Sequence, residues 1–173
     1  MKRVLILYAS KSGTTKKSAE TLARALAPDC DLYDLRKGTL ITLSGTSTQK
    51  HFCSLDLSSY RAIALGSAMY MGRPLGAFMR FCTERTQALL NQPLFLFSCG
   101  LATAEEETSY LWPLLPETLT RHAEKLYHLG GELRPDGGFL QRMVLNDYEK
   151  KSHAAPSLNT VVIEQLTQAL RAE

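Results

Sequence analysis

The chain has 173 residues, a length typical of one domain that buries about 70% of the surface its unfolded form would expose. Hydrophobic residues make up 45% of the sequence and charged residues 21%, a balance that excludes a wholly disordered chain. The net charge is only +3, and the lysines and arginines are scattered instead of clustered among aromatic residues, so we expect no nucleic-acid partner.

Alternating strand and helix patterns begin near the amino terminus. Residues 4–7 form an apolar run bounded by a turn-like cluster, which predicts a strand buried on both faces. The spacing of Ala19, Leu22, Ala23 and Leu26 then predicts one apolar face of a helix. Residues 30–35 predict a second strand, and residues 36–60, rich in Ser, Thr and Gly, predict a loop with at most a short helix.

Three further strands and three further helices are predicted beyond residue 60. The strands are residues 62–65, residues 94–97 and, more weakly patterned, residues 125–133. Helical patterns cover residues 75–90, with Pro74 at the first turn, and residues 110–122, with two prolines near the start. Residues 157–171 predict the last helix, with Ser157 as its cap.

Strands that alternate with helices indicate an α/β domain whose parallel sheet is covered on both faces. Five strands suggest the doubly wound order 2-1-3-4-5, with residues 1–173 as a single domain. Ligands of such sheets bind beyond the carboxyl ends of the strands, near the point where the strand order reverses. The loops after Tyr8, Leu65 and Phe97 are therefore the candidate site.

The first of these loops is rich in hydroxyl groups. Its candidate binding residues are Ser10, Lys11, Ser12, Gly13, Thr14 and Thr15. Hydroxyls, backbone N–H groups freed by Gly13 and the amino end of a helix form a nest that suits a phosphate. The single glycine argues against a dinucleotide or triphosphate loop and favours a phosphate monoester. Lys11 and the lysines at 16 and 17 either add attraction or are solvated surface residues.

At this point the sequence resembles a known family. Ser10-x-Ser12-Gly13-x-Thr15 directly after a first strand is similar to the flavodoxin loop (Ser/Thr)-x-(Ser/Thr)-Gly-x-Thr, which binds the phosphate of FMN. The resemblance implies a flavodoxin-like three-layer sandwich and FMN as the cofactor. An ordinary helix cap rich in Ser and Thr is the alternative.

The other two loops extend the resemblance. The segment ALGSAMYMGRPLGAFMRF looks like the flavodoxin segment that wraps the flavin ring, which implies backbone contacts from Ser67, Ala68 and Met69 and stacking by Tyr70. A surface or core tyrosine is the alternative for Tyr70. The third loop would supply further ring contacts from Ser98, Cys99, Gly100 and Leu101. Gly100 would let the backbone approach the ring, whereas Cys99 is equally a buried, inert thiol.

The stretches MGRPLGAFMRF and GGELRPDGGFLQRMVL look most like the flavodoxin-domain group that includes the menaquinone-dependent protoporphyrinogen oxidases. This implies an FMN-dependent oxidoreductase that works with a redox partner or a small electron acceptor such as a quinone. Residues 130–151, basic and apolar, either receive an amphipathic acidic substrate, touch a membrane surface or pack on the sheet as a connection. No catalytic acid or base has a recognisable spacing, so the substrate stays open.

Two other functions remain possible from the sequence. One is an electron carrier without its own substrate, for which the acidic run at residues 105–107 would be the docking patch, although the pI near 8.7 argues against it. The other is a domain that has lost flavin.

The four cysteines are widely spaced and the four histidines show no ligand pattern, so we expect structural thiols and no metal. The apolar run at residues 4–7 is too short for a signal peptide or a membrane span, so a cytoplasmic protein is expected.

Overall fold

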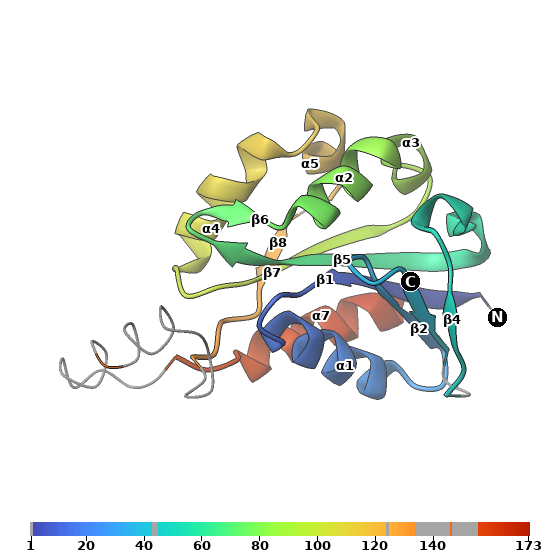
Figure 1. Ribbon diagram of the computed structural model, residues 1–173, viewed down its shortest axis with the longest axis horizontal. Coiled ribbons are helices and arrows are strands. Elements are labelled where there is room, and N and C mark those ends of the chain that lie inside the picture. Colours follow the sequence, from blue (N-terminus) through green and yellow to red (C-terminus); the bar gives the residue numbers. More distant parts are fainter. Residues whose placement is uncertain (1, 43–44, 124, 134–145, 147–155) are drawn as a thin grey trace.

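Figure 1 shows the computed structural model, in which helices cover both faces of a central sheet. The structure describes residues 2–42, 45–123, 125–133, 146 and 156–173. Its central strands run parallel in the order β2-β1-β5-β7-β8. They are β1 (Arg3–Ala9), β2 (Cys30–Asp34), β5 (Tyr60–Tyr70), β7 (Leu94–Cys99) and β8 (Leu126–His128). The predicted order 2-1-3-4-5 is confirmed, since these are the first to fifth predicted strands.

The sheet is wider than predicted because two short strands extend its β2 edge. The strands β3 (Thr39–Ile41) and β4 (Ser47–Gln49) pair antiparallel, followed by single 3-10 turns η1 (Phe52–Ser54) and η2 (Leu57–Ser59). The prediction of a loop over residues 36–60 was therefore wrong. A strand of three residues is too short to show a period of two, and its pairing with β2 is a tertiary contact that local composition does not reveal.

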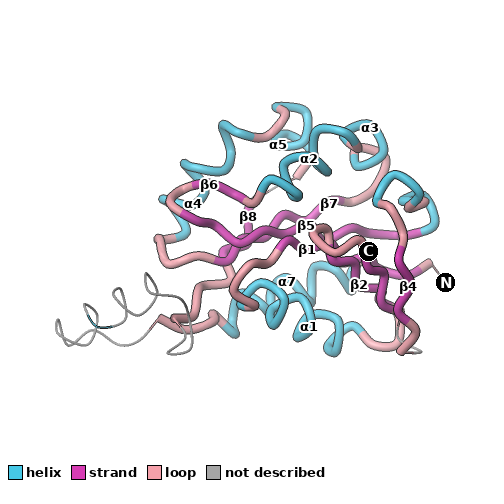
Figure 2. Tube along the Cα trace, in the orientation of Figure 1, coloured by secondary structure: helices cyan, strands magenta, loops and turns pink. Residues whose placement is uncertain are grey.

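One face of the sheet is covered by two helices, α1 (Thr14–Leu26) and α7 (Thr160–Ala172), which lie side by side in Figures 1 and 2. The predicted apolar face of α1 is buried against the sheet together with Ile163, Leu166 and Leu170 of α7. The cap of α7 is Asn159, whose side chain accepts a hydrogen bond from the Val162 N–H at 3.2 Å. Ser157 is therefore not the cap, because the helix begins three residues later than predicted.

The opposite face is covered by α2 (Gly76–Glu84), α3 (Thr86–Leu89), α4 (Ala104–Leu111) and α5 (Glu117–His122). The predicted helix over residues 75–90 is divided at Arg85, whose guanidinium donates to the carbonyls of Phe52 and Leu55 at 2.6 and 2.8 Å. The predicted helix over residues 110–122 is also wrong as one element. A 3-10 turn, η3 (Trp112–Leu114), separates α4 from α5 because the two prolines interrupt the helical hydrogen bonds.

The third predicted strand continues past its expected end. After Tyr70 the chain turns back as β6 (Arg73–Pro74), so that Met69 pairs with Pro74 and Tyr70 with Arg73. Met71 and Gly72 in the turn both have positive φ values, 50° and 72°, the geometry of a two-residue hairpin turn. Pro74 therefore lies in a short edge strand and not in the first turn of a helix.

Beyond β8 the described chain leaves the sheet. The predicted fifth strand, residues 125–133, is regular only over Leu126–His128, and Gly130 makes an isolated bridge to Leu158. The basic and apolar residues expected to matter between 134 and 151 lie outside the described residues. None of the helices in the described ranges has both the length and the apolar character needed to cross a bilayer.

Candidate functional site

The carboxyl ends of three strands meet where the sheet reverses its order. Ala9 of β1 pairs with Ser67 of β5, and Ser67 pairs with Ser98 of β7. Both serines are fully buried. The three loops singled out in the sequence therefore start side by side, at the place where doubly wound sheets bind ligands.

The first loop leads into α1 without a side-chain cap. Gly13 occupies the N-cap position with φ 101°, a left-handed conformation that glycine adopts at little cost. Its N–H group donates to Ser10 Oγ at 3.2 Å, so this hydrogen bond closes the loop before the helix. The first turn of α1 has no acidic residue to offset the positive end of the helix dipole.

Two threonines in that first turn carry buried hydroxyls. Thr15 is fully buried and Thr14 is 7% exposed. The Oγ1 atom of each has no hydrogen-bond partner of normal geometry within the described part of the chain, although the Thr15 hydroxyl also interacts with the Cys99 thiol. A buried hydroxyl without a partner costs about 1–3 kcal/mol, so such atoms indicate a missing acceptor. Oxygens of a phosphate monoester at the amino end of this 13-residue helix would satisfy both hydroxyls, so the residues fit the phosphate of FMN.

The lysines of the first loop and of α1 differ in their surroundings. Lys17 Nζ lies 2.7 Å from Glu132 Oε1, and Lys16 Nζ lies 3.7 Å from Glu20 Oε1. Lys11 Nζ lies 5.4 Å from the centre of the Tyr70 ring, which brings the first and second loops into contact. The lysines at 16 and 17 are thus paired with carboxylates, whereas Lys11 is placed between two predicted ligand loops.

Sequence reasoning missed Arg36. Its Nη1 donates to the Ser10 carbonyl at 2.8 Å, so an arginine that follows β2 holds the backbone of the first loop. Asp34 Oδ1 fixes the start of that turn by accepting the N–H groups of Arg36 and Lys37 at 2.9 and 3.1 Å. The signal was available, because β2 neighbours β1 in this strand order and a residue after its carboxyl end lies near the loop after β1.

The residues of the second loop belong to a strand and its hairpin. Ser67 Oγ accepts the N–H of Leu75 at 3.0 Å and donates to the Ala68 carbonyl at 2.9 Å. Ala68 is buried, whereas Met69 and Tyr70 are half-buried. The latter two residues therefore have accessible surface at the end of the sheet, and Met71 at the turn is fully exposed.

The third loop is shorter than predicted, because β7 extends to Cys99 and buries both Ser98 and Cys99. Burial raises the pKa of the Cys99 thiol to about 12, which supports an inert thiol. Gly100 and Leu101 follow the strand. Gly100 donates its N–H to the Gly130 carbonyl at 3.2 Å, and Leu101 is exposed.

A buried acid and a histidine lie beneath this loop. Glu107 of α4 is only 1% exposed, and its Oε2 lies 3.0 Å from Nδ1 of His128 at the end of β8. The same Nδ1 lies 3.3 Å from Ser98 Oγ. Sequence reasoning had treated the acidic run as a surface patch and His128 as unremarkable. The spacing of Glu107 and Leu111 places both on one face of α4, and Leu111 is fully buried, a signal that could have revealed the acid.

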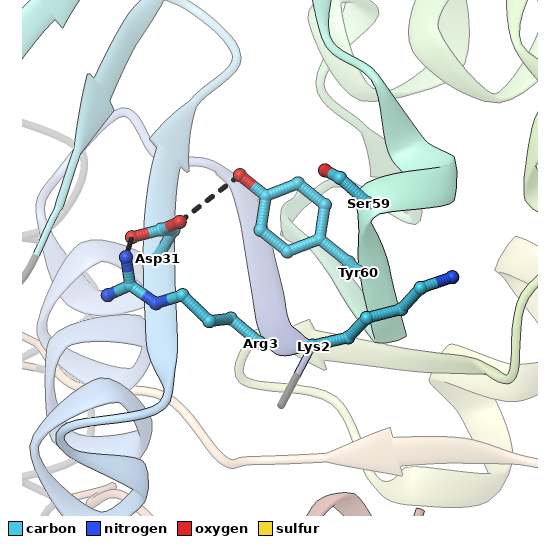
Figure 3. Close-up of a pocket in the computed structure, with 5 residues that line it drawn as sticks. All are labelled: Lys2, Arg3, Asp31, Ser59 and Tyr60. Atoms are coloured by element: carbon cyan, nitrogen blue, oxygen red, sulfur yellow. Dashed lines mark hydrogen bonds and ion pairs between the residues drawn. The ribbon is translucent and has the colours of Figure 1, made fainter.

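A separate pocket lies at the other end of the sheet. Figure 3 shows its lining, which comes from the amino ends of β1, β2 and β5, and its volume is about 540 Å³. Arg3 Nη1 lies 2.9 Å from Asp31 Oδ1, and Tyr60 donates to Asp31 Oδ2 at 3.2 Å. Asp31 is thus paired with Arg3 and Tyr60, although its Oδ1 has no hydrogen-bond partner of normal geometry among the described residues. The pocket lies at the amino ends of the strands, away from the end where doubly wound sheets bind ligands, so it is not the candidate site. Within the described ranges no cluster of three or more His, Cys, Asp or Glu residues could hold a metal ion.

Solved structures share the fold at low sequence identity. A mutant flavodoxin of Fusobacterium nucleatum bound to flavin mononucleotide matches with a TM-score of 0.50 and 16% identity, covering 73% of this chain and 68% of that one. An NADH:FMN oxidoreductase in its apo form matches with a TM-score of 0.51 and 16% identity, covering 98% and 87%. Rubredoxin oxygen:oxidoreductase from Desulfovibrio gigas has a TM-score of 0.51 and 14% identity, covering 99% and 37%.

One curated relative, from Leishmania major, is named protoporphyrinogen IX dehydrogenase (quinone). It is 27% identical over 103 residues, which cover 57% of this chain. They cover only 38% of the length of that relative. The family model described as a flavodoxin domain matches residues 5–156, most of the chain. The chain therefore belongs to the flavodoxin-domain family, and the predicted flavodoxin-like fold is confirmed.

Proposed function

We propose that the protein binds FMN at the carboxyl end of its sheet and acts as an oxidoreductase that exchanges electrons with a small acceptor such as a quinone. The observation that carries the proposal is the pair of buried threonine hydroxyls at the amino end of α1, which have no hydrogen-bond partner of normal geometry among the residues that the structure describes. When bound, FMN supplies the electron chemistry at its ring, and the protein supplies position, electrostatics and access.

Each loop has its own part in this proposal. Thr14 and Thr15 hold the phosphate through their hydroxyls and the first-turn N–H groups, and the helix dipole adds to the attraction. Arg36 keeps the loop in place through the Ser10 carbonyl. Tyr70, with its half-buried ring next to Lys11, offers a flat face on which the ring system can stack.

The relatives support an oxidoreductase more than they identify its substrate. The Fusobacterium flavodoxin binds flavin mononucleotide, and the Leishmania relative is named for protoporphyrinogen and quinone. The match spans only 38% of the length of the Leishmania relative, so its name does not fix the substrate of this chain. That name does make quinone and porphyrinogen the compounds to test first. The exposed apolar residues around the site, Met71 and Leu101, suit an apolar acceptor better than a charged one.

An electron carrier is the second candidate, and the acidic run that favoured it is weaker than it looked in the sequence. Glu107 is buried against His128, and the Glu106 carboxylate accepts the Thr103 N–H at 2.9 Å in a capping box. A docking patch needs exposed charges that are not already paired within the protein. The acidic run is therefore a weaker docking patch than the sequence suggested. A small-molecule electron acceptor is therefore favoured over a protein redox partner.

The test is flavin loading followed by anaerobic turnover. Flavin-free protein is mixed with FMN and separated from free cofactor, and a yellow protein with near-equimolar FMN is expected. The flavin is then reduced and mixed with a quinone, or left oxidised and mixed with a porphyrinogen. Rapid electron transfer to or from either compound supports the enzyme. Transfer only through a reductase partner, with strong salt dependence, would favour the carrier, and failure to bind FMN would refute both.

A further inference from the structure

Glu107 is the buried acid closest to the third ligand loop, and burial of a carboxylate is expensive unless it is paired. Its Oε2 is paired with Nδ1 of His128. Because a carboxylate only accepts hydrogen bonds, Nδ1–H of His128 is the donor. The second oxygen, Oε1, has no hydrogen-bond partner among the residues that the structure describes. Half of this carboxylate is therefore unsatisfied in the interior.

The unsatisfied oxygen lies against the backbone of Gly100. A β-carbon placed on Gly100 would lie 1.7 Å from Glu107 Oε1 and 3.2 Å from the β-carbon of Met69. On the other side, a β-carbon on Gly131 would lie 2.4 Å from the Gly100 carbonyl oxygen. The loop backbone at Gly100 is thus confined between the carboxylate and the segment that follows β8. No side chain separates the charge from the loop.

His128 links this contact to the end of β7. Its Nδ1 lies within 3.3 Å of Ser98 Oγ as well as 3.0 Å from the acid, so one N–H group serves both the strand and the helix. The ring is largely buried, with 13% of its side chain exposed. Two other ionisable groups interact in this region: the Cys99 thiol, whose pKa burial raises to about 12, and Glu132, which is paired with Lys17. Asp34, the other buried carboxylate of the described site, lies at the first loop and accepts two backbone N–H groups, whereas Glu107 lies against the third loop.

We propose that Glu107 and His128 are positioning residues that shape the Gly100 backbone and set the relative affinity of the site for oxidised and reduced flavin. This inference rests on the proposed function, since it requires FMN in the site. A carboxylate in a low-dielectric interior acts strongly on charge that develops nearby. Reduction adds electron density to the flavin ring, so the negative charge of Glu107 disfavours the reduced cofactor. The hydrogen bond from His128 limits this effect by stabilising the charge of the carboxylate.

The matched pair of variants is Glu107→Gln and Glu105→Gln. The first replaces the buried carboxylate by an amide of nearly equal size, and the second removes the same charge from an exposed position on the same helix. We expect Glu107→Gln to favour reduced over oxidised FMN at least tenfold, as the ratio of the two dissociation constants. This corresponds to a rise of about 30 mV in the two-electron potential. Glu105→Gln should leave the potential unchanged, because water screens an exposed charge.

His128 is tested by a conservative rescue. Asparagine retains an N–H donor near the place of Nδ1, whereas leucine leaves the acid buried without one. His128→Leu should weaken the binding of oxidised FMN at least tenfold relative to His128→Asn. It should weaken riboflavin equally, because the defect is at the ring and not at the phosphate. Circular dichroism identifies a variant that fails to fold, in which case the potential of Glu107→Gln decides the question.

The outcomes separate this inference from the proposed function. If the wild type binds neither flavin, both proposals fall together. If it binds FMN and Glu107→Gln has the potential of Glu105→Gln, the proposed function stands and the positioning role is overturned. A shift confined to Glu107→Gln, with the asparagine rescue at His128, supports the inference, because a merely structural contact would change stability without changing the potential.

Discussion

Gly100 and Glu107 are in direct contact across the third loop, and a β-carbon on the glycine would lie 1.7 Å from Oε1 of the acid. We predict that Gly100→Ala lowers the free energy of unfolding by about 1–3 kcal/mol, the usual cost of an overpacked site. Adding Glu107→Ala should recover part of this loss, because the two changes share one space and are not additive. Chemical denaturation of the two single variants and the double variant measures the coupling.

Gly76 provides the control for that cycle. It is the first residue of α2, and a β-carbon there would meet no atom of the described residues within 4 Å. Gly76→Ala should leave the protein equally stable or more stable by up to about 1 kcal/mol, since alanine favours helices. If Gly100→Ala were as harmless as Gly76→Ala, the confinement of the loop backbone would be wrong.

The threonines of α1 predict opposite effects on stability and binding. Thr14→Val removes a buried hydroxyl that has no hydrogen-bond partner in the described part of the chain, so the flavin-free protein should become more stable by about 1 kcal/mol in phosphate-free buffer. The same change should weaken FMN binding by about 1.5–3 kcal/mol, the value of a hydrogen bond to a charged group, and leave riboflavin binding unchanged. Fluorescence titrations of the two flavins check this. Thr21→Val is the control, because the Thr21 hydroxyl donates to the Lys17 carbonyl within α1 at 2.9 Å.

Met71 is predicted to destabilise the turn between β5 and β6 because of its positive φ. It is fully exposed at φ 50°, a conformation that residues other than glycine, asparagine and aspartate adopt unfavourably. Met71→Asn should raise the free energy of unfolding by about 0.5–1 kcal/mol, whereas Met71→Ala removes the same apolar side chain without easing the backbone. If Met71 contacts the electron acceptor, both variants slow turnover with a quinone alike. An equal melting temperature for the two variants would contradict the backbone argument.

The cysteines differ in reactivity according to burial. Burial raises the pKa values of the Cys30 and Cys99 thiols to about 12 and also raises that of Cys82, whereas Cys53 is exposed. At pH 8 a thiol reagent should modify one cysteine rapidly in the native protein and four after denaturation. Because the native state retains these protons where the unfolded state loses them, stability should fall as the pH rises from about 9 towards 12. Rapid modification of two or more thiols would contradict the burial.

Much of the fold and part of the site could be predicted from local patterns. The buried run of β1, the apolar face of α1 and the hydroxyl-rich loop between them are contiguous in sequence, and so their signals were strong. The antiparallel strands β3 and β4 and the β5–β6 hairpin were missed because their pairing depends on neighbouring strands that short segments do not encode. Arg36 was missed because the loop it contacts lies far from it in sequence. Glu107 was missed because it belongs to an acidic run that was expected to be exposed.

The most direct test of the account is the preference of flavin-free protein for FMN over riboflavin, which differ only by the phosphate. Equilibrium titration in phosphate-free buffer should give an FMN dissociation constant at least about 100-fold smaller, because two charge-assisted hydrogen bonds and the helix amino end act on the phosphate. Added inorganic phosphate should weaken FMN binding by competition and leave riboflavin binding unaffected. Equal affinity for the two flavins, or binding of neither, would contradict the assignment of the α1 loop as a phosphate site.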